Sequence, residues 1–101
     1  MLCASGLLVA ISAPALGSGA SVKVSGYKFT PKTTHVSKGS TVTWKWSASN
    51  DDKHNVTFKG FHSKSQKRGQ FTHTFRTKGT FTYVCTFHAK SHGMKGTVVV
   101  S

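Results

Sequence analysis

The sequence predicts an all-β protein, a small Greek-key β-sandwich or barrel of about seven strands. From Ser21 onward, apolar and polar residues alternate with a period of two, which is typical of strands with one buried face. Glycine and proline turn signals interrupt this pattern about every 8–12 residues, the spacing expected of a sandwich of short strands. No amphipathic helix is predicted. A chain of 101 residues with 37% hydrophobic content has room for one such domain.

Residues 1–20 differ in composition from the rest of the chain. Residues 7–11 form an apolar core that small residues follow, which is typical of an export signal. The basic start of such a signal is missing, so we interpret Met1 as a late start codon. We predict an export signal in residues 1–20, truncated at its start, and a folded domain in residues 21–101. Cleavage after Ala15, Gly17 or Ala20 is equally consistent with the sequence.

This signal predicts an exported protein that is periplasmic, extracellular or at the cell surface. An uncleaved anchor is the alternative, although spanning a bilayer takes about 20 apolar residues and this stretch is interrupted by Gly, Ser and Pro. Whether the protein is released or tethered is left open by the sequence.

The first strand is expected between Ser21 and Pro31, which ends it. Gly26 predicts a bulge or a bend within this strand. Its inward-facing stripe is expected to consist of Val22, Val24, Tyr27 and Phe29.

Two later strands each follow a Lys-Gly turn, at residues 41–46 and 81–85. In the first, Val42, Trp44 and Trp46 share one face, the alternation of a half-buried antiparallel strand, so the tryptophans are predicted to be core. Further strands are expected at residues 54–58, 71–75 and 97–100, with a loop or ragged edge strand at residues 60–69.

A short run near the C-terminus contains the residues most suited to a metal: Cys85, His88, His92 and Met94. A thiolate, an imidazole and a thioether suit copper better than zinc, because two histidines, a cysteine and a weak axial methionine form the blue-copper ligand set. The second histidine must come from elsewhere, and His54 is the candidate. Strand parity points both His54 and Cys85 toward the core.

The cysteine count bears on this prediction. Removal of the signal would remove Cys3 and leave Cys85 without a disulfide partner in an oxidising compartment. Metal ligation is one way to restrain such a thiol, and an inert buried cysteine is the alternative.

The domain is strongly basic. All 14 Lys and Arg and both acidic residues follow residue 20, giving a net charge of +12. Such a charge attracts acidic protein surfaces, anionic lipids or wall polymers, and nucleic acid, without selecting among them.

Residues 21–101 resemble the cupredoxins of the plastocyanin, amicyanin and pseudoazurin group. The segments that carry the resemblance are Gly39-Ser40-Thr41-Val42-Thr43-Trp44, His54-Asn55-Val56, residues 79–86, His88 and residues 93–98. The resemblance implies a cupredoxin-like domain with one type 1 copper, held strongly by His54, Cys85 and His88 and weakly by Met94. It also implies that Asn55 hydrogen-bonds Thr86 behind the ligands.

One departure concerns the ligand loop. The interval from His88 to Met94 is one residue longer than in plastocyanin, and it contains His92. His92 is therefore an alternative to His88 as the second imidazole.

The function expected from this resemblance is that of an exported blue copper protein that shuttles single electrons and is not an enzyme. Its expected partners are acidic redox proteins (a cytochrome, oxidase or reductase) that dock near His88, where Phe87, Ala89 and Gly93 form an apolar patch. A monomer is expected. The basic charge of the domain also suits electrostatic association with an anionic membrane or cell-wall surface.

Two other functions are weighed against electron transfer. A copper carrier or buffer would hand over metal rather than electrons. A polyanion-binding β-domain is suggested by the charge, but export and the inward parity of the aromatic residues disfavour nucleic acid.

An enzyme is the least favoured alternative. Multicopper oxidases require His-x-His pairs, and the six histidines include none.

Overall fold

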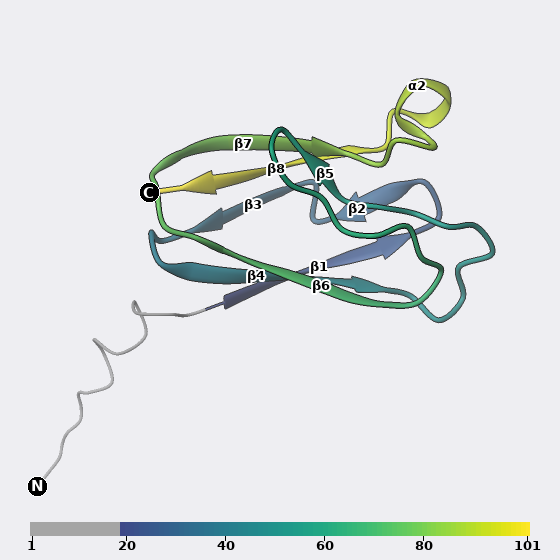
Figure 1. Cartoon of the computed structure of the whole chain (residues 1–101), viewed down its shortest axis with the longest axis horizontal. Helices are drawn as coiled ribbons and strands as arrows, with labels where there is room; N and C mark the ends of the chain where they lie inside the picture. The colour runs from purple at the N-terminus through teal and green to yellow at the C-terminus, as the bar shows by residue number, and fades with distance from the viewer. Residues whose placement is uncertain (1–18) are drawn as a thin grey trace, which may run out of the picture.

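A computed structural model describes residues 19–101 and shows a two-layer β-sandwich (Figure 1). The predicted export signal lies outside the described residues up to position 18, and the first strand begins at Gly19, two residues before the predicted domain boundary. The elements are β1 (Gly19–Ser25), β2 (Lys28–Thr30), β3 (Thr33–Val36), β4 (Ser40–Trp46), β5 (Thr57–Phe58), β6 (Gly69–Phe75), β7 (Gly79–Val84), α2 (Ala89–His92) and β8 (Lys95–Val100).

Each layer is a four-stranded sheet. One sheet has the strand order β2-β1-β4-β6 and the other the order β3-β8-β7-β5. The pairs β1–β4 and β3–β8 are parallel, whereas the remaining pairs are antiparallel. The predicted all-β sandwich is therefore confirmed, with eight strands in mixed sheets.

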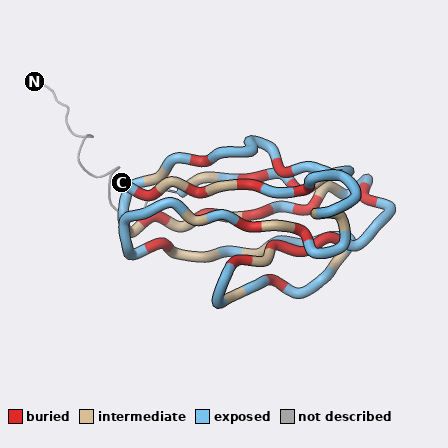
Figure 2. The backbone as a smooth tube through the Cα atoms, turned by 90° about the horizontal axis from the view of Figure 1, so that it is seen from above, coloured by how far each residue is buried: buried red, intermediate tan, exposed pale blue. Residues whose placement is uncertain are grey.

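The core lies between the sheets and follows the predicted alternation. Buried and exposed residues alternate along the strands in Figure 2. Val42 and Trp44 are fully buried and Trp46 nearly so, while Lys45 between the tryptophans is exposed. Trp44 packs against four aromatic neighbours, namely Phe58, Phe71, Phe75 and Tyr83. These aromatic contacts explain why the period-two pattern is strongest in this strand.

The prediction that Tyr27 faces the core is wrong. Gly26 has φ of +62°, which allows a tight turn, and Ser25 pairs with Lys28 across an antiparallel hairpin. The expected bend is thus a reversal that makes β1 and β2 separate strands. Tyr27 lies in the turn with 43% of its surface exposed, while Phe29 regains the buried face.

Three other features differ from the expected elements. Strand β3 was not predicted, and β5 is limited to two residues of the expected strand at residues 54–58. A four-residue helix, α2, occupies the loop between β7 and β8. No helix of residues 19–101 has the length and apolar character needed to cross a membrane.

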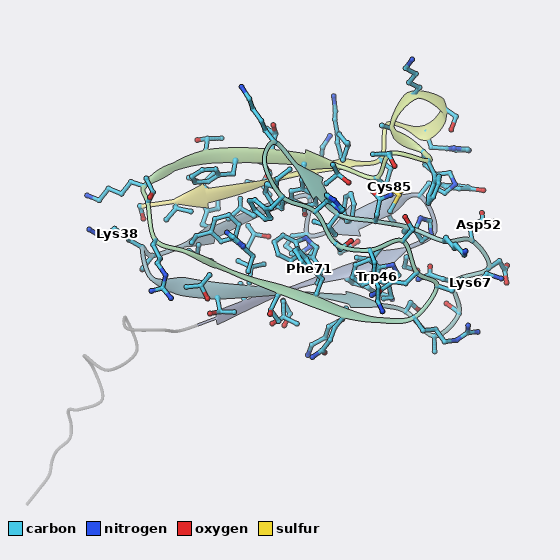
Figure 3. The ribbon with its side chains drawn as sticks, viewed as in Figure 1. Lys38, Trp46, Asp52, Lys67, Phe71 and Cys85 are labelled. Carbon is cyan, nitrogen blue, oxygen red and sulfur yellow. The ribbon has the colours of Figure 1, made fainter. Side chains whose placement is uncertain are left out.

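The sandwich has two distinct ends. Figure 1 places α2 at one end, and the chain terminus after β8 and the start of β1 at the other. Figure 3 places Cys85 and Asp52 at the α2 end and Lys38 at the opposite end. Cys85, the predicted metal ligand that Figure 3 labels, therefore lies at the same end of the sandwich as α2.

Candidate metal centre

Cys85 follows the last residue of β7 and points into the sandwich. Its backbone N–H donates to the carbonyl of Met94 (3.0 Å), which extends the β7–β8 pairing past Val84 and Lys95. The thiol is fully buried and forms no disulfide. Strand β7 thus delivers an unpaired thiol that is itself shielded from solvent.

His54 reaches the same site from the segment between β4 and β5. A pair of backbone hydrogen bonds with Gln66, each 3.0 Å, holds His54 in an isolated bridge. The Trp46 indole N–H donates to the carbonyl of His54 (3.2 Å). His54 is 1% exposed, so its ring is fixed among buried side chains.

His88 and Met94 are held by the turns that surround α2. The N–H of His88 donates to the carbonyl of Cys85 (3.1 Å), and the N–H of Met94 donates to the carbonyl of His88 (3.2 Å). Gly93 ends α2 with φ of +62°. Met94 is fully buried next to Cys85, whereas His88 is half-buried.

The side chains of His54, Cys85 and His88 converge on one point. The Cys85 Sγ lies 3.9 Å from the His54 Nδ1 and 3.6 Å from the His88 Nδ1. One ligand atom from each of the three residues lies within 4.8 Å of the others. A buried thiol between two imidazoles provides a soft donor set that suits copper, and the buried Met94, whose backbone is hydrogen-bonded to Cys85, is the nearby source of a thioether.

The environment of His54 favours the form that binds metal. Burial lowers the pKa of His54, the nearby His88 lowers it further, and Asp52 opposes the shift. A neutral imidazole offers a lone pair to a metal ion, so His54 is kept in the ligating form.

Asn55 joins the two segments that carry the buried ligands. Its Nδ2 donates to the Thr86 Oγ1 (2.8 Å), and its Oδ1 accepts from the Thr86 backbone N–H (3.0 Å). The same side chain contacts Thr57 and Ser65. The hydrogen bond from Asn55 to Thr86 that the resemblance implied is thus present, and it fixes the residue after His54 to the residue after Cys85.

His92 is not part of the cluster. It is exposed, its Nδ1 lies 2.8 Å from the Ser91 Oγ, and its ring stacks on Tyr27 with centroids 3.7 Å apart. The geometry therefore brings His88 rather than His92 beside Cys85. Sequence reasoning missed Tyr27 as a neighbour of the site, and its only signal was Gly26, which indicates a bend but not its direction.

Comparison with known proteins agrees with this geometry. Residues 18–101 match the family described as "Copper binding proteins, plastocyanin/azurin family". Halocyanin from Natronomonas pharaonis is 35% identical over 82 residues, which cover 74% of this chain and 49% of halocyanin. The chain thus spans about half the length of that curated relative.

Solved structures show the same similarity. A purple cupredoxin from Nitrosopumilus maritimus superposes with a TM-score of 0.68 at 26% identity, over 81% of this chain and 99% of the other. A reduced Cu(I) form of an amicyanin variant superposes with a TM-score of 0.69 at 33% identity, over 82% of each chain.

Proposed function

The chain belongs to the plastocyanin/azurin family of copper-binding proteins, and from this premise we propose that it is a blue copper protein that carries single electrons between redox partners. Copper is its cofactor, and His54, Cys85, His88 and Met94 are arranged as a type 1 copper site. The observation that carries the proposal is the convergence of a buried, unpaired thiol and two imidazoles within 4.8 Å.

We propose that His54, Cys85 and His88 are the strong ligands and Met94 the weak one. When bound, copper would supply a one-electron change between Cu(II) and Cu(I). The chain's own contribution is rigidity: Asn55 fixes the two ligand-bearing segments to each other, so the ligands move little when the charge changes. The burial of His54, Cys85 and Met94 keeps water away from their donor atoms.

The route for electrons is proposed to pass through His88. His88 is half-buried, whereas the other three proposed ligands are fully or almost fully buried. Phe87 beside it is 53% exposed and provides apolar surface. We expect an acidic cytochrome, oxidase or reductase to dock on this surface, because a net charge of +12 attracts anionic partners.

Export and a monomeric state are parts of the same proposal. The apolar segment at residues 7–11 supports export, and the unpaired Cys85 would then be protected by its metal.

Repeated redox cycling distinguishes an electron carrier from a copper carrier. The Cu(II)-loaded domain is reduced and reoxidised electrochemically in the presence of a Cu(I) chelator, and both the current and the chelated copper are measured. We expect a reversible one-electron wave with copper retained over many cycles. Transfer of copper to the chelator in the first reduction would instead support a copper carrier. Cys85→Ser, which lacks the thiolate, is the control that should give no reversible wave.

A further inference from the structure

Tyr27 is an aromatic residue of the β1–β2 turn that lies over the ligand loop. Its ring stacks on His92, with an interplanar angle of 10° and centroids 3.7 Å apart. The same ring packs edge-on against His88, with centroids 4.7 Å apart at 60°. Tyr27 therefore contacts a proposed ligand directly and through the next histidine of the loop.

The turn that presents Tyr27 is anchored to the rest of the fold. The Gly26 N–H donates to the Oδ1 of Asn50 (3.2 Å), and the Nδ2 of this buried Asn50 donates to the carbonyl of Val24 (3.0 Å). The Tyr27 hydroxyl donates to the Oδ2 of Asp52 (3.3 Å), two residues before His54. The hydrogen bonds of the β1–β2 turn and of the Tyr27 hydroxyl thus restrict the position of the Tyr27 ring, although the residue is partly exposed.

The ligand loop, in contrast, has few anchors on its outer side. No residue of α2 is buried, and His88 is held by backbone bonds to Cys85, His92 and Met94 and by the 3.6 Å contact of its Nδ1 with the Cys85 Sγ. Backbone bonds fix the position of a residue but leave the χ angles of its side chain free. An aromatic ring against one edge of the imidazole restricts that rotation.

We propose that Tyr27 is a positioning residue for the copper site: it orients the His88 imidazole by direct contact and holds the loop in place through its stack on His92. This inference rests on the proposed function, because it assumes that His88 is a ligand. It assigns to His92 a structural role in the loop, since its ring packs on Tyr27.

The metal-free domain tests the contacts first. Ring-proton NMR shifts of His88 and His92 are compared in the wild type, Tyr27→Phe, Tyr27→Leu and the control Lys28→Ala, which changes the next, exposed residue of the hairpin. We expect the ring-current shifts of both histidines to be kept in Tyr27→Phe and Lys28→Ala and lost in Tyr27→Leu. Unchanged shifts in Tyr27→Leu would overturn the inference without any reference to copper.

The Cu(II)-loaded domain then tests the consequence. We expect Tyr27→Leu to keep the blue band but to change the copper hyperfine splitting in electron paramagnetic resonance and to weaken copper binding by about tenfold, the lower end of effects seen for outer-shell partners. Tyr27→Phe should keep the wild-type hyperfine splitting and copper affinity, because the exposed 3.3 Å hydrogen bond from the Tyr27 hydroxyl to Asp52 contributes little.

The two proposals fail in different ways. A wild type without a blue band contradicts the proposed function, while the metal-free ring shifts still decide whether Tyr27 contacts His88 and His92. A wild-type blue band with identical hyperfine splitting and copper affinity in Tyr27→Leu overturns the positioning role alone. The unfolding midpoint of the metal-free domain shows whether Tyr27→Leu is folded under the conditions of the comparison. Altered hyperfine splitting or copper affinity in Tyr27→Phe, which keeps the ring, would also overturn positioning by the ring.

Discussion

At the scale of single residues, Asn55 connects the proposed copper ligands although it is not one of them. It is buried, and its amide satisfies the backbone N–H and the hydroxyl of Thr86. Strict alternation from the inward-facing His54 would put Asn55 on the outer face. The structure buries both because the regular strand begins only at Thr57 and the Asn55 amide finds partners across the site.

Removing this amide should loosen the site. We expect Asn55→Ala to lower the free energy of unfolding by about 1–3 kcal/mol, since the backbone N–H and the hydroxyl of Thr86 lose their part-buried hydrogen bonds to this amide, and to weaken copper binding by about 10–100-fold. Chemical denaturation and chelator competition measure the two effects. Ser65→Ala, which removes only the 3.2 Å bond to Asn55, is the control and should change both much less. Equal effects of the two variants would contradict the role of Asn55.

Tyr83 makes a prediction about alkaline pH. Burial raises the pKa of Tyr83 from 10.0 to about 12, an effect that the adjacent Trp44 partly offsets. The unfolded chain releases this proton near pH 10 and the folded chain retains it, so stability should fall as pH rises from about 10 toward 12, by at most about 3 kcal/mol. Denaturation at pH 8 and pH 11 measures the loss. Tyr83→Phe should abolish most of this loss of stability. An equal loss in that variant would show that ionisation of Tyr83 is not its cause.

Alternation within β7 correctly predicted that Cys85 faces the core, and His54 is buried as predicted although alternation does not hold at residues 54–56. Tyr27 could not be placed in this way. A glycine inside an alternating run is compatible with a bulge or with a reversal, and only the pairing of Ser25 with Lys28 decides between them.

At the scale of elements, the loop from Cys85 to Met94 is shaped by the short helix α2. The helix ends at Gly93, whose φ of +62° is unfavourable for residues with a side chain, and the Gly93 N–H donates to the carbonyl of Ala89. This ending directs the chain back so that Met94 reaches the side of Cys85.

Replacing this glycine tests the loop. A Cβ at Gly93 would meet no atom within 4 Å, so the cost of Gly93→Ala is conformational, about 1–2 kcal/mol. We expect a correspondingly lower unfolding midpoint and a smaller loss in Gly93→Asn, because asparagine tolerates this conformation better. Thermal denaturation of the metal-free domain compares them. An alanine variant as stable as the wild type would show that the loop does not depend on this ending.

Strand β3 was not predicted from the sequence, and the reason is physical. Strand β3 has the polar sequence Thr-Thr-His-Val and pairs in parallel with β8, more than 60 residues later in the chain. Such a strand is specified by its partner and not by its own pattern. The core strands β4 and β7 were predictable because each buries one face of large aromatic or β-branched residues.

At the scale of the whole molecule, charge is distributed unequally. The 14 basic residues are spread along the domain, whereas both acidic residues, Asp51 and Asp52, lie in a hollow beside His54 and Tyr27. An acidic partner is thus attracted by the overall field but meets two carboxylates near the proposed docking surface. This arrangement favours rapid encounters that separate readily in salt.

This distribution predicts the kinetics of association. We expect the electron-transfer rate with an acidic partner to fall steeply between low salt and 0.15 M salt, where the Debye length is about 8 Å. Asp51→Asn should raise the low-salt rate, because it removes a like charge from the docking end, while Lys38→Gln at the opposite end should change it less. Stopped-flow mixing provides the rates. A rate independent of salt would contradict electrostatic steering.

His54, Cys85, His88 and Met94 are proposed to hold one type 1 copper together. The visible absorption spectrum of the purified domain during titration with Cu(II) tests this proposal most directly, alongside Cys85→Ser, His88→Ala and His92→Ala. The account predicts an intense blue thiolate-to-copper band that reaches its maximum at one copper per chain, disappears in the Cys85 and His88 variants and persists without His92. A folded wild type without this band, or a band that needs His92 and not His88, would contradict the account.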